Sequence, residues 1–438
     1  MLRTAGVLPG YSPRDEAETY GKEVGAGYSR PCGKQMKILH FADLHLGVEA
    51  YGHPDPDTGL NSRFLDLLRC LDTVVERALE GDVDLVLFCG DAYKSRRPEP
   101  TEQREFAKRM ARLASRDIPV FLLTGNHDRP QGIGRAAALE VFPALAIKNI
   151  TVAHQPGTYL VSTRAGPLQV VALPWARPSA TFAQGLTMED LDQKVAEGMA
   201  AVIQQEAARL DPGLPAVLAA HLWVLGSKVG SECGMVVGKE PTLSPSALAQ
   251  PAFSYVALGH IHRHQVLRQE RPIIAYSGSP ERLDFSDEDD DKGYYLVEMK
   301  DGEAIPTFHP TPARRFLTLR PKLDPGGPNP TATVLGELAR QDIQGAIVRL
   351  EITLPRGLAI EEGEVRKALR EAYYARLSVM PATAEPRVRL PVETRGLAPL
   401  DALGFYLDTR KTPPERKGLL LKYARELMED PSGGGPGE

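Results

Sequence analysis

Short runs of consecutive apolar residues alternate with segments of helical apolar period from residue 36 to about residue 300. A strand-like segment lies at 36–41, and the apolar runs lie at 85–88, 119–123, 217–220 and 255–258. Each run is short and ends abruptly at a polar residue or a glycine, which is typical of strands buried on both faces. Helices are expected between them at 61–80 and 101–116. The alternation of strands and helices predicts a layered α/β domain.

The pattern changes after residue 312, where a smaller unit is expected. Its predicted elements are a strand at 315–319, a helix at 331–340, a strand at 346–354, a helix at 361–375 and a strand at 387–390. This order indicates a small α+β domain over 313–390. A segment rich in proline and threonine at 306–312 predicts a linker before it.

The C-terminal part, residues 391–430, predicts a helical segment. Two amphipathic helices are expected within 399–428, and Leu400, Leu403 and Leu407 share one face of the first. Residues 431–438 are rich in glycine and predict a flexible tail.

The first 35 residues have no apolar period and predict a disordered extension. A strand pattern begins abruptly at Met36. We therefore expect Met36 to be the true start codon and residues 1–35 to be an artefact of gene assignment.

Composition narrows the class of protein. Apolar residues make up 42% and charged residues 25% of the 438 positions, as in ordinary globular proteins, and the net charge of −5 excludes a uniformly basic surface. A local basic patch would still suffice for nucleic-acid binding. The cysteines at 32, 70, 89 and 233 have no paired spacing, so reduced thiols are expected and not disulfides or a cysteine zinc site. Without a bilayer-spanning run or a signal-peptide pattern, a cytoplasmic protein with no membrane segment is expected.

Polar side chains that can bind metal follow each buried strand. In chain order they are Asp43 and His45, then Asp91, then Asn126 and His127, then His221, and finally His260 and His262. The carboxyl ends of adjacent parallel strands meet at one edge of a sheet, where ligands bind. Two residues separated by one position on an extended chain point the same way, so Asp43 and His45 are expected to hold one ion together.

The residue types define the chemistry at this edge. Carboxylate, amide and imidazole ligands without thiolate favour Mn²⁺, iron or Zn²⁺. Seven ligands are too many for one tetrahedral ion and suit two ions, with Asp91 as the bridge. Paired ions about 3.5–4 Å apart clamp a phosphodiester and promote its hydrolysis. Each motif alone is common in turns and on surfaces. Five of the ten histidines, however, fall at strand ends together with these acids, and chance placement explains such a set poorly.

The ordered set resembles the calcineurin-like metallophosphoesterase superfamily, with Asp-x-His, Gly-Asp, Gly-Asn-His-Asp, a single His and Gly-His-x-His in that order. Finer features are similar to the SbcD nuclease family. They are residues 42–47, Arg63, 95–98, 259–265, 276–285 and Lys292-Gly293. The resemblance covers about 37–300 and implies a four-layer α/β/β/α nuclease domain over 36–312.

The resemblance also implies a role for each ligand. One ion would be held by Asp43, His45, Asp91 and His262. The other would be held by Asp91, Asn126, His221 and His260. His127 would lie just outside these ligands and act in catalysis, by stabilising charge on the phosphate or protonating the leaving oxygen, for which imidazole is suited near neutral pH. Both ions are expected to be Mn²⁺.

A DNA nuclease is the implied function, with 3′–5′ exonuclease activity on duplex ends and endonuclease activity on hairpin or single-stranded DNA. It would act in DNA replication, recombination and double-strand-break repair, in the cytoplasm at the nucleoid. Residues 313–390 would form a DNA-capping domain, and 391–430 would dock on a coiled-coil ATPase, SbcC. A homodimer of this chain within a heterotetramer is the implied assembly.

Basic residues cluster after the second motif. Arg96, Arg97, Arg104, Lys108, Arg109, Arg112 and Arg116 form either a solvated helix face or a surface that tracks phosphates. The expected DNA contacts are Lys94, Arg96, Arg97 and Arg129, without base reading. Many relatives have a histidine at the position of Lys94. A lysine can contact phosphate as a point charge, but it is a poor proton shuttle.

The acidic run at 287–291 predicts a solvated turn.

Two other functions fit parts of the pattern. An enzyme of the same superfamily that acts on a small phosphomonoester or a cyclic nucleotide would share the metal ligands, but the added region 313–428 argues against it. A non-catalytic scaffold subunit would have lost ligands, whereas every ligand position of this chain is filled.

Overall fold

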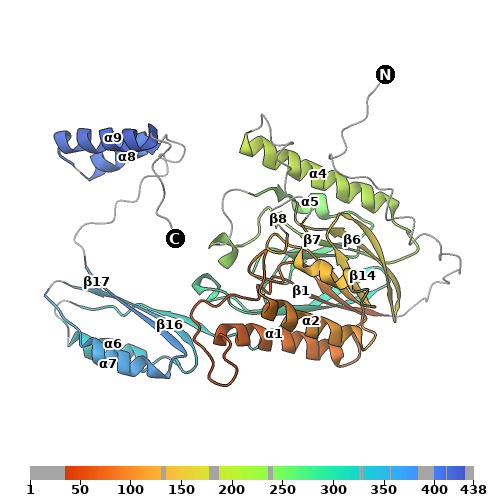
Figure 1. Cartoon of the computed structure of the whole chain (residues 1–438), viewed down its shortest axis with the longest axis horizontal. Helices are drawn as coiled ribbons and strands as arrows, with labels where there is room; N and C mark the ends of the chain where they lie inside the picture. The colour runs from red at the N-terminus through yellow and green to blue at the C-terminus, as the bar shows by residue number, and fades with distance from the viewer. Residues whose placement is uncertain are drawn as a thin grey trace.

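Two six-stranded β-sheets stacked face to face, with helices on both outer sides, form the larger part of the molecule (Figure 1). The computed structural model describes residues 35–129, 135–176, 187–234, 240–324, 327, 329–355, 357–382, 399–410 and 412–429. Helix α4 (Met188–Arg209) lies on one outer side, and α1 (Ser62–Leu79) and α2 (Pro100–Ala114) lie on the other. No helix within these ranges is both long and apolar enough to cross a membrane.

The first sheet contains the first four strands of the chain in sequence order. Its spatial order is β14 (Glu303–Pro310), β13 (Gly293–Lys300), β1 (Met36–Phe41), β2 (Leu85–Phe88), β3 (Val120–Leu123) and β4 (Ile150–Ala153). Strands β1 to β4 are parallel, β13 is antiparallel to β1, and β14 is antiparallel to β13. Because parallel neighbours need crossover connections, α1 and α2 follow β1 and β2 and cover the outer face, together with the short α3 (Val141–Ala144).

The second sheet has a similar construction. Its spatial order is β11 (Gln265–Arg268), β12 (Ile273–Tyr276), β10 (Tyr255–Gly259), β7 (Ala216–His221), β6 (Gly166–Leu173) and β5 (Gly157–Thr163). Strands β12, β10, β7 and β6 are parallel, whereas β11 and β5 are antiparallel edge strands. Helices α4 and α5 (Pro245–Leu248) cover its outer face. The two-stranded pair β8 (Trp223–Val224) and β9 (Thr242–Leu243) packs on the same core.

Side chains that point alternately to the two faces of each strand divide the core into layers. Ile38 and Leu87 point between the two sheets, where they share a core with Ala257 of the second sheet. Their sequence neighbours Leu39 and Val86 belong to the core under α1 and α2. Successive side chains of a strand face opposite sides of its sheet, so one apolar run supplies both layers. The predicted four-layer α/β/β/α architecture is confirmed.

The expected linker at 306–312 is wrong for most of its length, because the residues up to Pro310 belong to β14. This strand pairs with β13 from Glu303 to Pro310 and is the edge strand of the first sheet. An edge strand tolerates proline, since one side of it needs no ladder partner. Proline-rich composition at this position therefore marked an edge strand.

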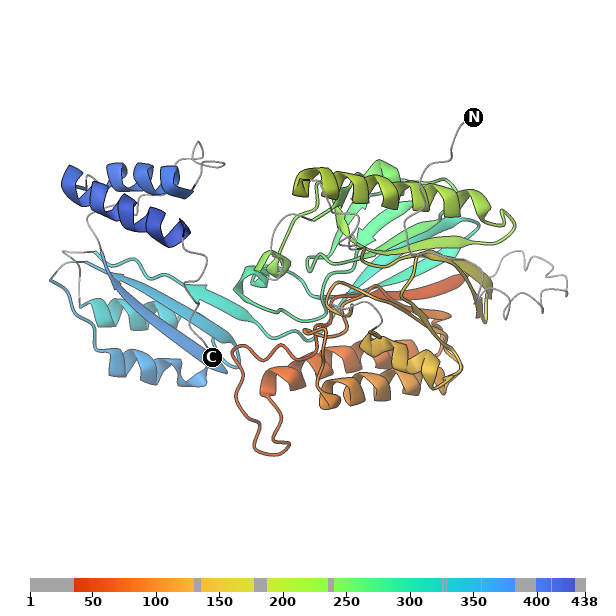
Figure 2. The same ribbon diagram turned by 45° about the horizontal axis from the view of Figure 1, so that its top comes forward.

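A three-stranded parallel sheet forms a second unit (Figures 1 and 2). It consists of β15 (Phe316–Leu319), β16 (Ile347–Leu354) and β17 (Tyr374–Pro381) in that spatial order. Helices α6 (Pro330–Leu338) and α7 (Glu362–Ala368) pack on it through a core that includes Val334, Val348 and Val365.

The expected helix at 361–375 is too long. Helix α7 ends at Ala368, a 3₁₀ turn occupies Leu369–Glu371, and β17 begins at Tyr374. The backbone N–H of Tyr373 donates to the carbonyl oxygen of Ala346 (2.9 Å), next to the first β16–β17 pair. A partner strand that is distant in the sequence decides this boundary. The expected strand at 387–390 lies outside the described residues.

Two helices, α8 (Pro399–Thr409) and α9 (Pro414–Glu429), confirm the pair expected within 399–428. They pack against each other and lie apart from the two stacked sheets (Figure 2). Lys417 of α9 pairs with Asp408 of α8 (2.5 Å). The expected extension up to residue 34 and the expected tail at 431–438 lie outside the described residues.

A buried ion network fastens the second unit to α1. Arg63 is fully buried and donates to Asp66 (2.7 Å). Arg314, just before β15, donates to both oxygens of the same carboxylate (2.5 and 2.6 Å) and lies 3.6 Å from the ring centroid of Tyr373. The backbone N–H of Arg314 donates to Glu281 (2.9 Å). Buried charges are tolerated only when they are paired, so the network fixes where the second unit begins.

A histidine lies in the core between the two sheets. His40 of β1 is fully buried, with Nδ1 3.0 Å from the hydroxyl of Tyr255 and Nε2 3.2 Å from the carbonyl oxygen of Leu258. Burial lowers the pKa of His40 from 6.5 to about 3. The folded protein therefore keeps this imidazole neutral at a pH where the unfolded chain binds a proton.

We expect acid to destabilise the fold through His40. Because folding depresses its pKa, its contribution is present above pH 6.5 and is lost as pH falls from 6.5 towards about 3. The loss should be roughly 1.4 kcal/mol per pH unit. The free energy of unfolding of His40→Gln should therefore fall less on acidification than that of the wild type. Urea unfolding followed by the fluorescence of Trp175 and Trp223 measures this, and equal losses in both proteins would contradict the assignment.

Candidate metal centre

The carboxyl ends of five strands meet at one edge of the stacked sheets. Strands β1, β2 and β3 of the first sheet and β7 and β10 of the second end there. They bring together seven side chains, which are Asp43, His45, Asp91, Asn126, His221, His260 and His262. None of these is more than 6% exposed. All seven residues that the sequence predicts as metal ligands therefore lie in one buried cluster.

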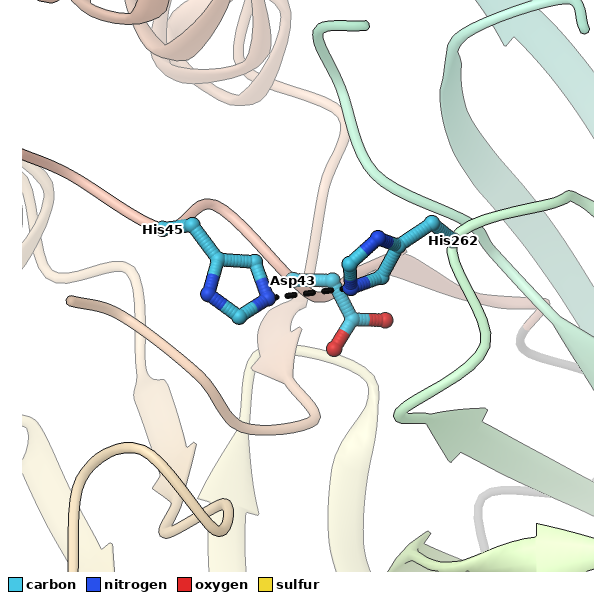
Figure 3. Close-up of side chains that lie close together, drawn as sticks. All are labelled: Asp43, His45 and His262. Atoms are coloured by element: carbon cyan, nitrogen blue, oxygen red, sulfur yellow. Dashed lines mark hydrogen bonds between the residues drawn. The ribbon is translucent and has the colours of Figure 1, made fainter. Parts of the chain in front are cut away.

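One half of the cluster is built around His45 and His262. Their Nε2 atoms lie 3.0 Å apart and face each other (Figure 3). Asp43 lies beside both rings, and one donor atom from each of the three residues lies within 4.8 Å of the others. Nε2 of His45 is also 3.6 Å from Oδ2 of Asp91.

The other half is built around Asn126. Its Oδ1 lies 3.0 Å from Nε2 of His221 and 3.2 Å from Nδ1 of His260. Nε2 of His221 lies 3.4 Å from Oδ2 of Asp91, the same oxygen that faces His45. Asp91 thus stands between the two halves, where a bridging carboxylate would have to lie.

Left-handed backbone conformations, and not extended chain, place Asp43, His45 and Asp91. The φ angles of Asp43, His45 and Asp91 are 55°, 48° and 60°. The expectation that Asp43 and His45 point the same way along an extended chain is therefore wrong, because β1 ends at Phe41 and the chain turns before both residues. Non-glycine residues rarely adopt positive φ, and such strain is concentrated at functional sites.

Glycines let the strand ends approach one another closely. A Cβ on Gly259 would lie 2.0 Å from the carbonyl oxygen of Cys89, and a Cβ on Gly90 would lie 2.3 Å from Nδ1 of His221. Gly90 also has a φ of +99°. Larger residues at these two positions would push the ligand-bearing loops apart.

Asp128 organises the loops next to the ligands. Its buried carboxylate accepts the backbone N–H groups of Asp91 (2.8 Å), Ala92 (3.0 Å) and Gly125 (3.0 Å). Burial and the charge of Asp91 raise the pKa of Asp128 to about 6. From the sequence alone, Asp128 is only the last residue of the Gly-Asn-His-Asp motif. The available signal was an acidic residue closing a glycine-led turn, a common way to bond loop backbone.

Burial and neighbouring charge set the protonation of the ligands. Burial raises the pKa of Asp43 and lowers the pKa values of His45 and His262 well below their usual range, which leaves both imidazoles neutral. Burial alone would raise the pKa of Asp91, but His221 and its neighbouring histidines outweigh it and hold that pKa well below its usual range. Burial also opposes charge on His221, but Asp91 prevails and raises its pKa to about 9.

The donor set fits divalent metal ions. Oxygen and imidazole donors without thiolate are typical ligands of Mn²⁺, Zn²⁺ and iron. The buried thiol of Cys89 faces the carbonyl oxygen of Ala257 (3.5 Å), and burial raises its pKa, so this thiol is not one of the donors. Nε2 of His45 and Nε2 of His262 face each other beside Asp43, and a cation between them would accept the lone pairs of both nitrogens. Metal binding at His221 would displace the proton of that ring.

His127 lies at the more exposed side of the cluster. Its ring centroid is 4.9 Å from that of His45, and its backbone N–H donates to Oδ1 of Asp91 (2.8 Å). Its Nδ1 lies 2.7 Å from the carbonyl oxygen of Lys94. Since a carbonyl oxygen only accepts, Nδ1 carries the proton, and in the neutral ring Nε2 is the basic nitrogen.

The four residues expected to contact DNA are placed in two ways. Arg96 donates through Nε to the carbonyl oxygen of Asn126 (3.1 Å), and Arg129 donates to the carbonyl oxygen of Trp175 (2.8 Å). Lys94 and Arg97 are exposed. The first pair is therefore fixed to neighbouring loops, and the second pair faces solvent.

Basic residues on α2 pair with acids. Arg109 donates to both oxygens of Asp72 (2.7 Å each), and Arg112 donates to both oxygens of Glu76 (2.6 and 3.2 Å). Both acids belong to α1. This neutralisation favours the interpretation of a solvated helix face over that of a phosphate-tracking surface.

The expected solvated turn at 287–291 is wrong, because Asp287 and Asp290 are buried. The buried ammonium of Lys292 lies 3.3 Å from Asp287 and 3.7 Å from Asp290. Arg263 pairs with Asp290 as well (3.2 Å). These counter-charges meet the acids only in the folded chain, so a run of acids in the sequence does not reveal them.

Three residues that sequence reasoning missed contact the ligands. The hydroxyl of Ser231 bonds Nδ1 of His262 (2.5 Å), and Glu232 accepts the backbone N–H of the same residue (3.2 Å). Oε2 of Glu240 lies 2.8 Å from Nε2 of His260, although the angles are not those of a hydrogen bond. All three belong to the connection between β8 and β9, which has no motif, so only the tertiary structure identifies them.

This chain is similar to known proteins. Residues 36–264 match the family described as calcineurin-like phosphoesterase. The SbcD subunit of nuclease SbcCD from Rhodobacter capsulatus is 30% identical over 302 residues, which cover 64% of this chain and 71% of that protein. Its counterpart from Bacillus subtilis is 28% identical over 290 residues, which cover 61% and 67%. A solved dimetal phosphatase from Danio rerio aligns with a TM-score of 0.39 and 11% identity, over 63% of this chain and 96% of that one.

We expect Asp91→Asn to weaken metal binding more than a substitution of any other single ligand would. The amide lacks the negative charge that faces both halves of the cluster. Bound Mn²⁺ should fall from two ions per chain towards one or none, and the rise in Tm on adding Mn²⁺ should shrink. Elemental analysis after dialysis and thermal unfolding measure both. Asp72→Asn, which removes an acid from the surface of α1, is the matched control. Two ions retained by Asp91→Asn would refute the bridging position.

Proposed function

The chain belongs to the calcineurin-like phosphoesterase family and, within it, to the SbcD nucleases, and we propose that it cuts DNA as a two-metal phosphodiester hydrolase. One observation carries the proposal: seven buried donor residues form two adjacent groups, with one oxygen of Asp91 facing both. A small phosphoesterase would need the same centre, but not the second unit or the terminal helices. A scaffold subunit would not need the strained backbone at Asp43, His45 and Asp91.

Each group of ligands would hold one ion. Asp43, His45, Asp91 and His262 would hold the first, and Asp91, Asn126, His221 and His260 would hold the second. Bound divalent ions, which we propose to be Mn²⁺, supply Lewis-acid polarisation of the phosphodiester and lower the pKa of water. Burial keeps the rings of His45 and His262 neutral, so each can donate a nitrogen lone pair to a cation.

His127 is the proposed catalytic residue. Its bonds to Asp91 and to the carbonyl oxygen of Lys94 hold the ring at the exposed side of the centre, with Nδ1–H as the donor. Nε2 can then take up a proton and pass it to the leaving oxygen of the cleaved strand. A histidine is suited to this exchange near neutral pH.

DNA would be held through its phosphates. Arg96 and Arg129 each use part of a guanidinium on a backbone carbonyl, and the remaining N–H donors are available for phosphate oxygens. Lys94 and Arg97 are exposed and would add point charges. Contacts of this kind bind DNA of any sequence, as a nuclease that processes ends requires.

The remaining parts of the chain would serve this nuclease. We assign residues 36–312 to the nuclease domain, 313–390 to a unit that caps the bound DNA, and 391–430 to a segment that docks on a coiled-coil ATPase of the SbcC type. Exposed apolar side chains on the terminal helices support docking; they are Phe405, Leu419, Leu420 and Tyr423. The relatives are named as one subunit of nuclease SbcCD, which supports assembly of this chain with a partner subunit. We propose that it forms a homodimer within that larger complex and that the complex acts in DNA repair, recombination and replication at the nucleoid.

We expect His127→Asn to slow DNA cleavage by about 100-fold or more with Mn²⁺ binding retained, because it removes proton transfer to a poor leaving group. The variant should lose much less activity on bis(p-nitrophenyl) phosphate, whose leaving group departs without a proton. Rates on end-labelled duplex, hairpin and single-stranded DNA, with the chromogenic diester in parallel, test both statements. Equal losses on all substrates would exclude the proposed role. A faster reaction on a small phosphomonoester than on DNA would instead favour a small-molecule enzyme.

We expect deletion of 396–438 to abolish association with the ATPase partner while metal-dependent nuclease activity is retained. Leu420→Asp and Tyr423→Asp in the full chain should weaken association without truncation, since charge replaces exposed apolar surface. Co-purification measures binding, and Lys422→Ala on the same helix is the control for local change. A truncated chain that still co-purifies with the partner would refute this docking site.

A further inference from the structure

A chain of hydrogen bonds joins the metal-ligand candidate His262 to a buried acid. Nδ1 of His262 lies 2.5 Å from the hydroxyl oxygen of Ser231, and that hydroxyl donates to Oδ2 of Asp287 (2.8 Å). All three residues are at most 1% exposed. They come from three separate segments, the connections after β8, after β10 and before β13, so the fold alone brings them together.

The direction of these bonds follows from counting hydrogens. The hydroxyl of Ser231 has one hydrogen to donate, and an Asp carboxylate only accepts. Asp287 also accepts the backbone N–H groups of Ser231 (3.0 Å) and Leu283 (2.9 Å), and its Oδ1 lies 3.3 Å from the ammonium of Lys292. Four donors therefore point at this carboxylate, and the hydrogen of Ser231 is directed to it. The lone pair of Ser231 is left to accept from His262, whose proton must be on Nδ1.

This proton position determines which nitrogen of His262 can bind a metal. A neutral imidazole with hydrogen on Nδ1 has its lone pair on Nε2. Nε2 is the atom that faces His45, 3.0 Å away (Figure 3). The bond to Ser231 thus turns the basic nitrogen of His262 into the centre and prevents the opposite tautomer.

The other ligand histidines are held differently. Nδ1 of His221 lies 2.7 Å from the backbone carbonyl oxygen of Cys89. Nδ1 of His45 has no hydrogen-bond partner among the described residues. The backbone of His262 is held as well, because Lys292 donates to its carbonyl oxygen (2.8 Å) and Glu232 accepts its N–H (3.2 Å). Nε2 of His260 lies 2.8 Å from the carboxylate of Glu240. Among these four histidines and the described residues, a bond to a side-chain hydroxyl is therefore particular to His262.

We propose that Ser231 and Asp287 are positioning residues that fix the tautomer and ring orientation of His262 and so set the affinity of the metal subsite formed with Asp43, His45 and Asp91. The inference rests on the proposed two-metal centre. Partners of this kind orient metal-bound histidines in many proteins, and their loss typically weakens metal binding by about 10–100-fold. The subsite around Asn126 should not respond, because its histidines do not contact Ser231.

Calorimetric titration of the metal-free full chain with Mn²⁺ tests the proposal. In Ser231→Ala we expect one binding step to weaken by about 10–100-fold and the other to keep the wild-type affinity. Ser231→Thr retains the hydroxyl and should restore binding to within about threefold of the wild type. Ser286→Ala removes an exposed hydroxyl that bonds only Asp284 among the described residues, and it should bind as the wild type does.

Two further measurements keep the outcome decisive. The Tm of the metal-free protein shows whether Ser231→Ala is folded; if it is not, Ser231→Cys, a poorer acceptor of similar size, should show the same selective weakening. The absorption of bound Co²⁺ reports the ligand field, and only the signal of the weakened subsite should change. Wild-type affinity at both steps in a folded variant, or equal weakening of both, would overturn the proposal. Wild-type protein that binds two ions but does not cut DNA would refute the proposed substrate and leave the role of Ser231 intact.

Discussion

Two carboxylates, Asp43 and Asp91, are buried close together at the edge where the sheets meet, and the rest of the site is arranged to make this tolerable. Burial and the charge of Asp91 both raise the pKa of Asp43. Such groups are stable only when other groups replace the lost water. The backbone N–H of His260 meets both oxygens of Asp43 (2.9 and 3.0 Å), and that of His127 meets Asp91 (2.8 Å). The neighbouring histidines and, in the proposed function, divalent cations offset the remaining negative charge of the two carboxylates.

This constraint explains why the ligands belong to strand ends and not to flexible loops. Parallel strands that are buried on both faces deliver their last residues to one place, and tight turns after β1 and β2 then bend the chain towards the centre. Left-handed residues at 43, 45 and 91 would be unfavourable in isolation. The packed sheets on either side hold these residues in place, so the rigid core fixes the positions of the side chains in the site.

One segment, residues 276–292, connects this centre with the second unit. Its Glu281 accepts the backbone N–H of Arg314, at the start of that unit. Its Asp287 accepts the hydroxyl of Ser231, which also bonds the candidate ligand His262. Arg282 lies between them and donates to the carbonyl oxygens of Asp287 (3.2 Å) and Arg314 (3.2 Å). The joint that orients the second unit and the bonds that orient a metal ligand are therefore parts of one buried polar network.

The sequence by itself determined the layered α/β architecture and the cluster of candidate metal ligands at the strand ends, because apolar runs and the residues that end them are local features of the chain. It did not determine the conformation of Asp43 and His45, the boundary at Tyr374 or the burial of Asp287. Each of these depends on a partner that is distant in the sequence: the end of β2 for Asp43 and His45, strand β16 for Tyr374, and Ser231 for Asp287. Only the tertiary structure decided them, since strand pairing and charge compensation arise from contacts that no local pattern of residues contains.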